Sequence, residues 1–268
     1  MNYDDISISD IRRGFMYGDG VFETMRWSNN QLLFYKSHLS RLHHSMNALK
    51  LEDGNFNDEI FSNSISLLNS HNKHSDMRLR LSIFRTGEGL YRTNSRSYSW
   101  LLEYENLSNQ LYNVNKSGLK VDFSENVKLH PSSYSAYKTL NSLNYILAGI
   151  EATDRNVDDL IILNYEDLIV ESVSSNVYGF SNDKLFTPQL SSGCIDGIFK
   201  GVLKEVLPGL GIELIDSKMT IENLMNCSSV YLSNVITGLQ WVGQIGKINF
   251  QKGPIQDITD KVNSVLYD

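Results

Sequence analysis

The sequence predicts a mixed α/β (α+β) fold that is built in two parts. Segments in which apolar and polar residues alternate, as in β-strands, are interspersed with segments whose apolar residues recur at helical spacing. A polar, Asn-rich stretch, "YNVNKSGLK", lies between two groups of such segments. With 268 residues the chain can form one large domain or two modest ones. We therefore predict a first domain at 1–112, a linker at 113–119 and a second domain at 120–268.

Strands and helices mix in the first part. "GVFETMRWSNNQLLFY" predicts two strands around a Ser-Asn-Asn turn, which is a hairpin signal. "MRLRLSIFRTG" and "SYSWLLEYENL" predict two further strands, because Leu79, Leu81 and Ile83 alternate with polar residues in the former. "KSHLSRLHHSMNALKL" and "DEIFSNSISLLNSHN" predict amphipathic helices.

The second part opens with a predicted helix in "SAYKTLNSLNYILAGIEA". Its apolar residues recur at helical spacing, so one face should be buried, and Ser135 is a possible N-cap. The residues expected on the buried face are Leu140, Leu143, Leu147 and Ile150. Strand–turn–strand units are predicted in "DDLIILNYEDLIVES", "NVYGFSNDKLFTP" and "SSVYLSNVITGLQWVGQIG", and a further helix in "SSGCIDGIFKGVLKEVLPGLG".

Composition excludes several classes of function. The net charge is −7 and no long basic run occurs, so nucleic acid and anionic membranes are not expected partners. No apolar run approaches the roughly 20 residues that cross a bilayer. The start, "MNYDDISISD", carries no secretory signal, and two isolated cysteines make neither a disulfide scaffold nor a metal site. We predict a cytoplasmic protein without a metal.

Lys138 stands at the start of the predicted helix, where the helix dipole disfavours a cation. One interpretation is a solvated surface lysine, which is the common case. The other is an amine held neutral by desolvation and the dipole, which could attack a carbonyl carbon and form a Schiff base. This segment by itself does not decide between the two.

Other residues offer chemistry that such a lysine would need. "GCIDGIF" brings two glycines to a helix N-terminus, where backbone N–H groups favour a phosphate, although such turns are often only structural. Glu171 ends an apolar strand; it either faces water or holds a protonated ring nitrogen. His38 and Arg41 share a helix face, which suits an anion, a metal or solvent. A lysine, a carboxylate, an arginine and a phosphate-friendly helix start are the set that pyridoxal phosphate requires.

Five sequence blocks support this hypothesis through a family resemblance. They are "RRGFMYGDGVFETMRW", "HLSRLHHSMNALKL", "YKTLNSLNYILAGIEA", "ESVSSNVYGF" and "GCIDGIFKG". Their order resembles that in class IV, fold-type IV pyridoxal-phosphate enzymes, which include branched-chain aminotransferases, D-amino-acid aminotransferases and 4-amino-4-deoxychorismate lyases. The resemblance implies a small α/β domain, a larger β-rich domain that binds the cofactor, and a homodimer.

The resemblance also assigns roles to residues. Lys138 matches the Schiff-base lysine, Glu171 the carboxylate that pairs with the pyridine nitrogen, and Arg41 the phosphate-binding arginine. Further matches are Ile198 and Phe199 for backbone contacts to phosphate, Asn234 and Val235 for a second phosphate turn, Tyr17 and Phe22 for the substrate pocket, and Arg80 for a substrate carboxylate. The family more often has Ile-Thr-Arg where this chain has Ile-Phe-Lys, so a threonine hydroxyl is missing here.

Two reactions fit these residues. A transaminase would transfer the amino group between an amino acid of the branched-chain type and a 2-oxo acid. A lyase would release pyruvate and 4-aminobenzoate from aminodeoxychorismate. The D-amino-acid branch is disfavoured, because its Arg-x-His pair is missing after Arg85. "SNVITGLQWV" resembles lyase sequences, whereas transamination is the commoner activity of the group, and we take transamination as the first hypothesis.

Overall fold

The computed structural model describes residues 8–52, 61, 65, 76–108 and 111–267. It divides into two compact units. The first contains the chain up to residue 110 together with 137–141, and the second contains 111–136 and 142–268. The segment around Lys138 therefore belongs to the first unit, although it lies far along the chain. The domain limits 1–112, 113–119 and 120–268 stay a prediction.

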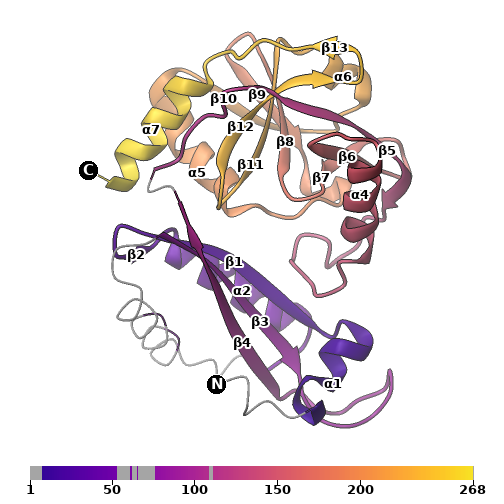
Figure 1. Cartoon of the computed structure of the whole chain (residues 1–268). Helices are drawn as coiled ribbons and strands as arrows, with labels where there is room; N and C mark the ends of the chain where they lie inside the picture. Colours follow the sequence, from indigo (N-terminus) through magenta and orange to yellow (C-terminus); the bar gives the residue numbers. More distant parts are fainter. Residues whose placement is uncertain (1–7, 53–60, 62–64, 66–75, 109–110, 268) are drawn as a thin grey trace. The chain divides into compact units, whose positions relative to one another are not determined.

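The first unit is a four-stranded antiparallel sheet with helices (Figure 1). Its elements are α1 (Ile8–Tyr17), β1 (Gly20–Ser28), β2 (Gln31–Leu32), α2 (Tyr35–Ala48), β3 (Asp76–Arg85) and β4 (Tyr98–Leu107), and the strand order is β2-β1-β3-β4. The predicted hairpin is confirmed: Asn29 and Asn30 have φ of 48° and 59° between β1 and β2. Asparagine tolerates this left-handed backbone, which two-residue hairpin turns require.

The core of the first unit lies between the sheet and α2. Leu79, Leu81 and Ile83 of β3 are fully buried, which confirms the alternation predicted for this strand. Leu42 and Met46 of α2 pack into the same core. Of the helix predicted in "DEIFSNSISLLNSHN", the structure describes only Phe61 and Ile65, both helical and buried; the rest lies outside the described residues.

The second unit is built on a nine-stranded mixed sheet. Its strands are β5 (Leu119–Leu129), β6 (Asp159–Asn164), β7 (Ile169–Ser172), β8 (Asn176–Ser181), β9 (Lys184–Pro188), β10 (Glu213–Ser217), β11 (Ser229–Asn234), β12 (Gly238–Ile245) and β13 (Ile248–Asn249). Its helices are α4 (Leu143–Asp154), α5 (Ile198–Val206), α6 (Ile221–Met225) and α7 (Ile255–Tyr267), with short 3-10 turns at Leu190–Ser192 and Leu207–Leu210.

The sheet order is β10-β9-β8-β11-β12-β5-β6-β7, and β13 pairs with β12. The predicted strand–turn–strand units are confirmed as the antiparallel pairs β6–β7, β8–β9 and β11–β12. The β8–β9 turn again uses two left-handed residues, Asn182 and Asp183. Helices α1, α6 and α7 and strands β5, β10 and β13 have no counterpart among the predicted elements. Among the described residues, no helix has the length and apolarity needed to cross a membrane.

The prediction for the helix near Lys138 was wrong in two respects. First, α4 begins at Leu143 with Ser142 as its N-cap, so Lys138 precedes the helix and Ser135 does not cap it. The reason is a backbone pairing: the Phe22 N–H donates to the Lys138 carbonyl (2.8 Å) and the Leu140 N–H donates to the Gly20 carbonyl (2.9 Å). Backbone groups that pair with a strand in this way are not available for the hydrogen bonds of a helix, so the segment stays outside α4.

Second, the face of α4 expected to be buried is exposed. Leu143, Leu147 and Ile150 are 65%, 47% and 53% exposed. The buried face instead carries Ala148, Glu151 and Ala152. Small alanines let the helix lie close to the sheet, and the Glu151 carboxylate accepts hydrogen bonds from Ser124 Oγ (2.7 Å) and the Glu125 N–H (2.8 Å). Polar anchoring of Glu151 therefore sets the rotation of α4, and the apolar stripe is left outside.

Candidate active site

Lys138 lies beside an aromatic ring in the first unit. Its Nζ is 4.7 Å from the centroid of the Phe22 ring, and the guanidinium carbon of Arg80 is 3.8 Å from the same centroid. Phe22 is on β1 and Arg80 on the neighbouring strand β3. Pairing of residues 138–140 with β1 brings Lys138 to that strand. This sheet thus brings two residues predicted for the site, Lys138 and Arg80, to the ring of a third, Phe22.

The surroundings of Phe22 are electropositive. Partial burial lowers the pKa of Arg80, the carboxylate of Glu103 opposes this effect, and Arg78 adds to it. The guanidinium group holds its proton so strongly that Arg80 stays positively charged at neutral pH despite this shift in pKa. A cation over a ring face is favourable, so Phe22 supports both Arg80 and Lys138. This cluster can attract a carboxylate next to an amine.

Tyr17, the other residue predicted for the substrate pocket, packs elsewhere in the first unit. Its ring lies 5.4 Å from that of Tyr91, and the guanidinium of Arg13 stacks over it at 5.2 Å. Arg13 also donates to the carboxylate of Asp19 (2.9 Å). Tyr17 thus belongs to a contact between α1 and the loop after β3.

Arg41 lies in a buried ionic cluster. Its Nε and Nη2 donate to the two carboxylate oxygens of Glu23 at 2.8 Å and 2.6 Å. His38 Nδ1 lies 2.7 Å from Glu23 Oε2. Burial raises the pKa of Glu23, but attraction to Arg41 and hydrogen bonds from His38 and Arg41 outweigh it and lower the pKa from 4.5 to about 2. His38 and Arg41 do share a helix face, and that face binds a carboxylate of the same chain.

This cluster and the Phe22 ring lie on different faces of the first sheet. Consecutive strand residues point to opposite faces, so Phe22 points away from the side that Glu23 faces. Within the first unit, Lys138 and Arg80 are therefore grouped together and Arg41 is not grouped with them. The phosphate role of Arg41 stays a prediction; the Glu23 salt bridge already uses Nε and Nη2, so phosphate would be bound through the rest of the guanidinium.

Glu171 is the last residue but one of β7 in the second unit and is buried, with 3% of its surface exposed. Tyr145 Oη donates to Glu171 Oε1 (2.6 Å), and the Ile195 N–H donates to Oε2 (3.1 Å). The interpretation of Glu171 as a carboxylate in water is thereby excluded. A buried carboxylate with a donor on each oxygen is held in a fixed orientation.

The predicted phosphate-binding helix start is the N-terminus of α5. Gly197 is its N-cap, without a side-chain cap, and Ile198 and Phe199 are its first two residues. A Cβ at position 197 would lie 1.8 Å from Oδ1 of Asn176, a buried side chain that donates to the Ile195 carbonyl (3.0 Å). Only glycine fits this approach, and the helix dipole favours an anion there.

The second predicted phosphate turn lies between β11 and β12. Asn234 Oδ1 accepts from the N–H groups of Ile236 and Thr237, both at 2.9 Å, so its side chain shapes the turn. Tyr112 Oη donates to the Val235 carbonyl (2.7 Å), and the Tyr112 ring meets that of Phe199 edge-on at 5.3 Å. Buried Tyr112 thereby connects the two turns within the second unit.

Sequence reasoning missed Tyr112, Tyr145 and Glu23. Tyr145 follows Lys138 by seven residues, and nothing in its local sequence reports that its hydroxyl reaches a strand end 26 residues further on. Glu23 gave a weak signal, because a charged residue in the otherwise apolar strand "GVFETMRW" requires a buried partner.

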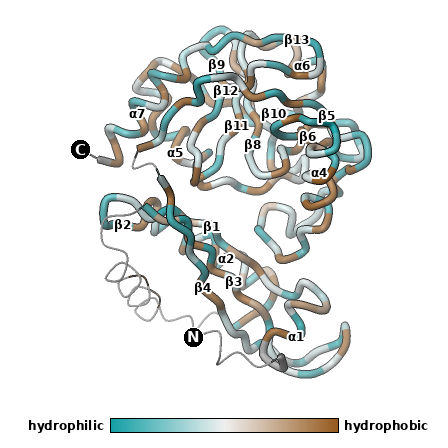
Figure 2. The backbone as a smooth tube through the Cα atoms, in the orientation of Figure 1, coloured by the Kyte–Doolittle hydropathy of each residue, from teal (hydrophilic) through white to brown (hydrophobic). Residues whose placement is uncertain are grey.

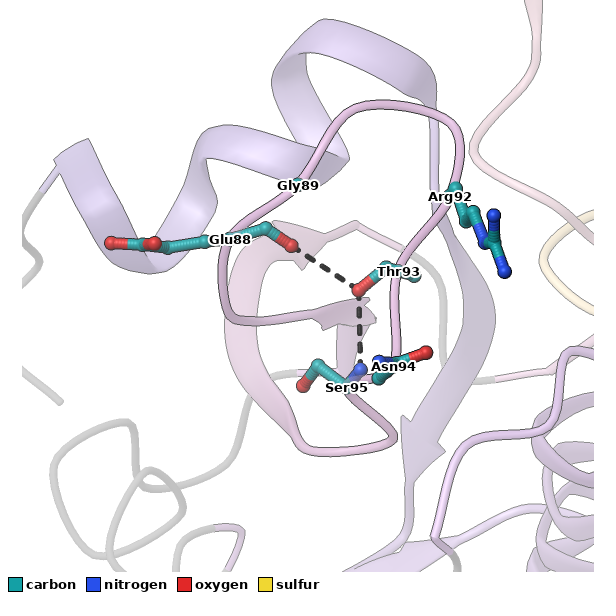
Figure 3. Close-up of a pocket in the computed structure, with 6 residues that line it drawn as sticks. All are labelled: Glu88, Gly89, Arg92, Thr93, Asn94 and Ser95. Atoms are coloured by element: carbon teal, nitrogen blue, oxygen red, sulfur yellow. Dashed lines mark hydrogen bonds between the residues drawn. The ribbon is translucent and has the colours of Figure 1, made fainter.

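A pocket of about 480 Å³ lies within the loop between β3 and β4. It is lined by Glu88, Gly89, Arg92, Thr93, Asn94 and Ser95. Figure 3 shows that Thr93 closes the loop: its hydroxyl donates to the Glu88 carbonyl (3.2 Å) and accepts from the Ser95 N–H (3.2 Å). None of the residues predicted for the site lines this pocket, so it carries no part of the proposed chemistry.

The donors of the second unit suit an aromatic cofactor with an anionic group. Glu171 is a fixed carboxylate of the kind that can hold a ring nitrogen, and the start of α5, where only glycine fits at position 197, is of the kind that can hold a phosphate. Within the first unit, the Lys138 amine lies beside Phe22. Residues of these types are those that enzymes using pyridoxal phosphate require.

Comparisons with known proteins identify the family. The family model for amino-transferase class IV matches residues 20–245. The chain is 25% identical to a Methanocaldococcus jannaschii protein provisionally named a branched-chain-amino-acid aminotransferase, over 98% of this chain and 91% of that protein. It is 24% identical to the aminodeoxychorismate lyase of Bacillus subtilis, over 93% and 85%.

The fold is shared with the branched-chain aminotransferase of Thermoproteus uzoniensis, solved with norvaline, at a TM-score of 0.84 and 22% identity over 98% and 90% of the two chains. The chain belongs to the class IV aminotransferase family. Enzymes of this class depend on pyridoxal phosphate, and the resemblance seen in the sequence is confirmed.

Proposed function

We propose that this enzyme transfers the amino group between a branched-chain-type amino acid and a 2-oxo acid, with pyridoxal phosphate as its cofactor. The observation that carries the proposal is the grouping of the Lys138 amine and the Arg80 guanidinium around the Phe22 ring. Both substrates have a carboxylate next to the reacting carbon. A guanidinium near the amine suits that carboxylate, because it can bind both oxygens.

Each residue then has a defined task. When bound, the cofactor supplies an electron sink for negative charge at the substrate α-carbon. Lys138 Nζ holds the cofactor and later takes the α-proton. Glu171 keeps the ring nitrogen protonated, and the amides of Ile198 and Phe199, the turn at Asn234 and Val235, and Arg41 hold the phosphate. Tyr17 and Phe22 line the substrate pocket, and Arg80 binds the substrate carboxylate.

A lyase that releases pyruvate and 4-aminobenzoate from aminodeoxychorismate is the second candidate. The similarity to the Bacillus subtilis lyase, at nearly the same identity as to the archaeal aminotransferase relative, supports it. Both reactions begin with removal of the same α-proton, so Lys138 and Glu171 would serve either of them.

Two measurements test the function. Borohydride reduction of the protein loaded with pyridoxal phosphate should attach the cofactor to Lys138, and Lys138→Ala should abolish both the adduct and turnover. A Lys138→Ala variant with the wild-type rate would refute the assignment. L-Leucine or L-glutamate should convert the bound cofactor to its pyridoxamine form. If aminodeoxychorismate yields pyruvate and 4-aminobenzoate while no amino acid gives that conversion, the enzyme is the lyase.

We further propose a cytoplasmic homodimer. Both cysteines are free thiols, as in a reducing compartment. The exposed face of α4 carries Leu143, Ile146, Leu147 and Ile150, each between 47% and 65% exposed, and Figure 2 colours parts of this helix as hydrophobic. A contiguous apolar stripe of this kind is typical of a protein contact. A second copy of the chain is the partner we propose for it.

A further inference from the structure

Tyr145 contacts Glu171, the carboxylate that binds the ring nitrogen of the cofactor in the proposed function. It is the third residue of α4, and its Oη donates to Glu171 Oε1 at 2.6 Å. The backbone N–H of Ile195 donates to the other oxygen at 3.1 Å. Each carboxylate oxygen thus accepts from a different element, one from helix α4 and one from the loop before α5. Together the two hydrogen bonds restrict rotation of the carboxylate.

The surroundings of this contact are apolar. Tyr145 packs against a buried cluster made of Val127, Leu129, Ala148, Ile162, Val170 and Cys194. A hydrogen bond to an anion is stronger in such surroundings than in water. Burial, and then the charge of Glu171, raises the pKa of Tyr145, so the phenol keeps its proton and remains a donor at neutral pH.

The thiol of Cys194, close to Glu171, stays uncharged. Burial, and then the charge of Glu171, raises the pKa of Cys194 to about 12. Its Sγ lies 3.6 Å from the carbonyl oxygens of Pro188 and Gln189, to which a protonated thiol can donate. Cys194 therefore stays neutral at neutral pH and adds no negative charge beside Glu171.

We propose that Tyr145 is a positioning residue for Glu171: its hydroxyl orients the carboxylate and stabilises its charge, so that the proton shared with the cofactor rests on the ring nitrogen. This inference rests on the proposed function. The physical reason is that a donor to the charged form of a carboxyl lowers its affinity for protons. Without the phenol, Glu171 becomes a stronger base and takes a larger share of that proton.

The first test uses the protein without cofactor. Glutamate labelled with ¹³C at Cδ reports the titration of each carboxyl group, and Glu171→Gln identifies the Glu171 signal. Tyr145→Phe should raise the pKa of Glu171 by about one pH unit, a tenfold change in proton affinity. Tyr231→Phe is the matched control, because it removes another buried phenol that donates to the Lys252 carbonyl at 3.1 Å. An unchanged Glu171 titration in Tyr145→Phe would overturn the proposal.

If Tyr145→Phe does not fold, the same titration of Glu171 can be measured in wild-type protein in which 3-fluorotyrosine replaces tyrosine. The more acidic phenol is a stronger donor and should lower the pKa of Glu171; no change would again contradict the proposal.

The second test uses protein loaded with pyridoxal phosphate labelled with ¹⁵N in the ring. In Tyr145→Phe the ring-nitrogen signal should move toward the unprotonated form, and in Tyr231→Phe it should not move. A Glu171 pKa that rises without any change at the ring nitrogen would overturn the role of Tyr145 toward the cofactor. Failure of wild type to bind the cofactor would refute the proposed function instead, and the cofactor-free titration would still decide whether Tyr145 controls Glu171.

Discussion

Glu23 and Arg41 form a two-point salt bridge that is almost entirely buried, with Nε–Oε1 and Nη2–Oε2 distances of 2.8 Å and 2.6 Å. The pair joins β1 to α2 and so connects the sheet of the first unit to its helix. Removing one partner of such a pair leaves an uncompensated charge in the core, which costs far more than a surface pair contributes.

We predict that Glu23→Gln lowers the free energy of unfolding at pH 7 by about 3–5 kcal/mol, because Arg41 loses its buried counter-charge. Urea denaturation measures this change. Glu105→Gln is the control, since the Arg78–Glu105 pair is long (3.8 Å) and exposed. It should change stability by less than about 1 kcal/mol. Equal effects of the two substitutions would contradict the importance of the Glu23 pair.

The same pair predicts a pH dependence. The pKa of Glu23 is about 2 in the folded protein and 4.5 ordinarily. Its contribution to stability is therefore complete above about pH 4.5 and is lost as the pH falls through 2. Glu23→Gln lacks this carboxyl, so its unfolding free energy should fall less steeply than that of wild type between pH 4.5 and 2. Parallel acid profiles from denaturation at several pH values would refute the pKa assignment.

Two glycines at the start of α5 should respond in opposite ways to alanine. In Gly197→Ala the new Cβ meets Asn176, so we expect a loss of about 1–3 kcal/mol and weaker binding of pyridoxal phosphate. In Gly201→Ala the Cβ meets nothing within 4 Å, and the higher helix propensity of alanine should add up to about 1 kcal/mol. Thermal unfolding and absorbance titration with the cofactor measure both variants. Similar cofactor affinities would argue against a phosphate at this helix start.

Arg80 should matter for substrate binding and Arg78 should not. Arg80→Gln removes the guanidinium beside Phe22 and Lys138, so KM for the 2-oxo acid should rise at least about tenfold, as expected for a lost charged hydrogen bond. Arg78→Gln, two residues earlier on β3, removes only the weak pair with Glu105 and should leave KM near the wild-type value. Steady-state kinetics distinguish the two, and equal KM values would remove Arg80 from the substrate site.

The apolar face of α4 should control assembly. Ile150→Glu places a charge within the exposed stripe, so a dimer formed through this face should dissociate at micromolar concentration. Val265→Glu is the control, because Val265 is 60% exposed on α7, outside the stripe. Sedimentation velocity reads the result. A dimer that is unchanged in Ile150→Glu would place the contact elsewhere.

Local patterns in the sequence determined much of this protein. Alternation predicted β3, and the Asn-rich turns predicted the β1–β2 and β8–β9 hairpins, because these signals depend on neighbours a few residues away. The ordered motifs also led to the class IV family, because its residue types recur in a fixed order along the chain.

Only the tertiary structure decided where the side chains act. Lys138 lies outside the helix because its backbone pairs with β1, more than a hundred residues earlier in the chain. α4 buries two alanines and a glutamate because Glu151 is bound by residues of strand β5, so its leucines and isoleucines face outward. Tyr145 reaches Glu171, and Arg41 reaches Glu23, through contacts between distant segments. Hydrogen bonds and charge pairs of this kind leave no periodic trace in a sequence, and they set the orientation of the groups on which the proposed chemistry depends.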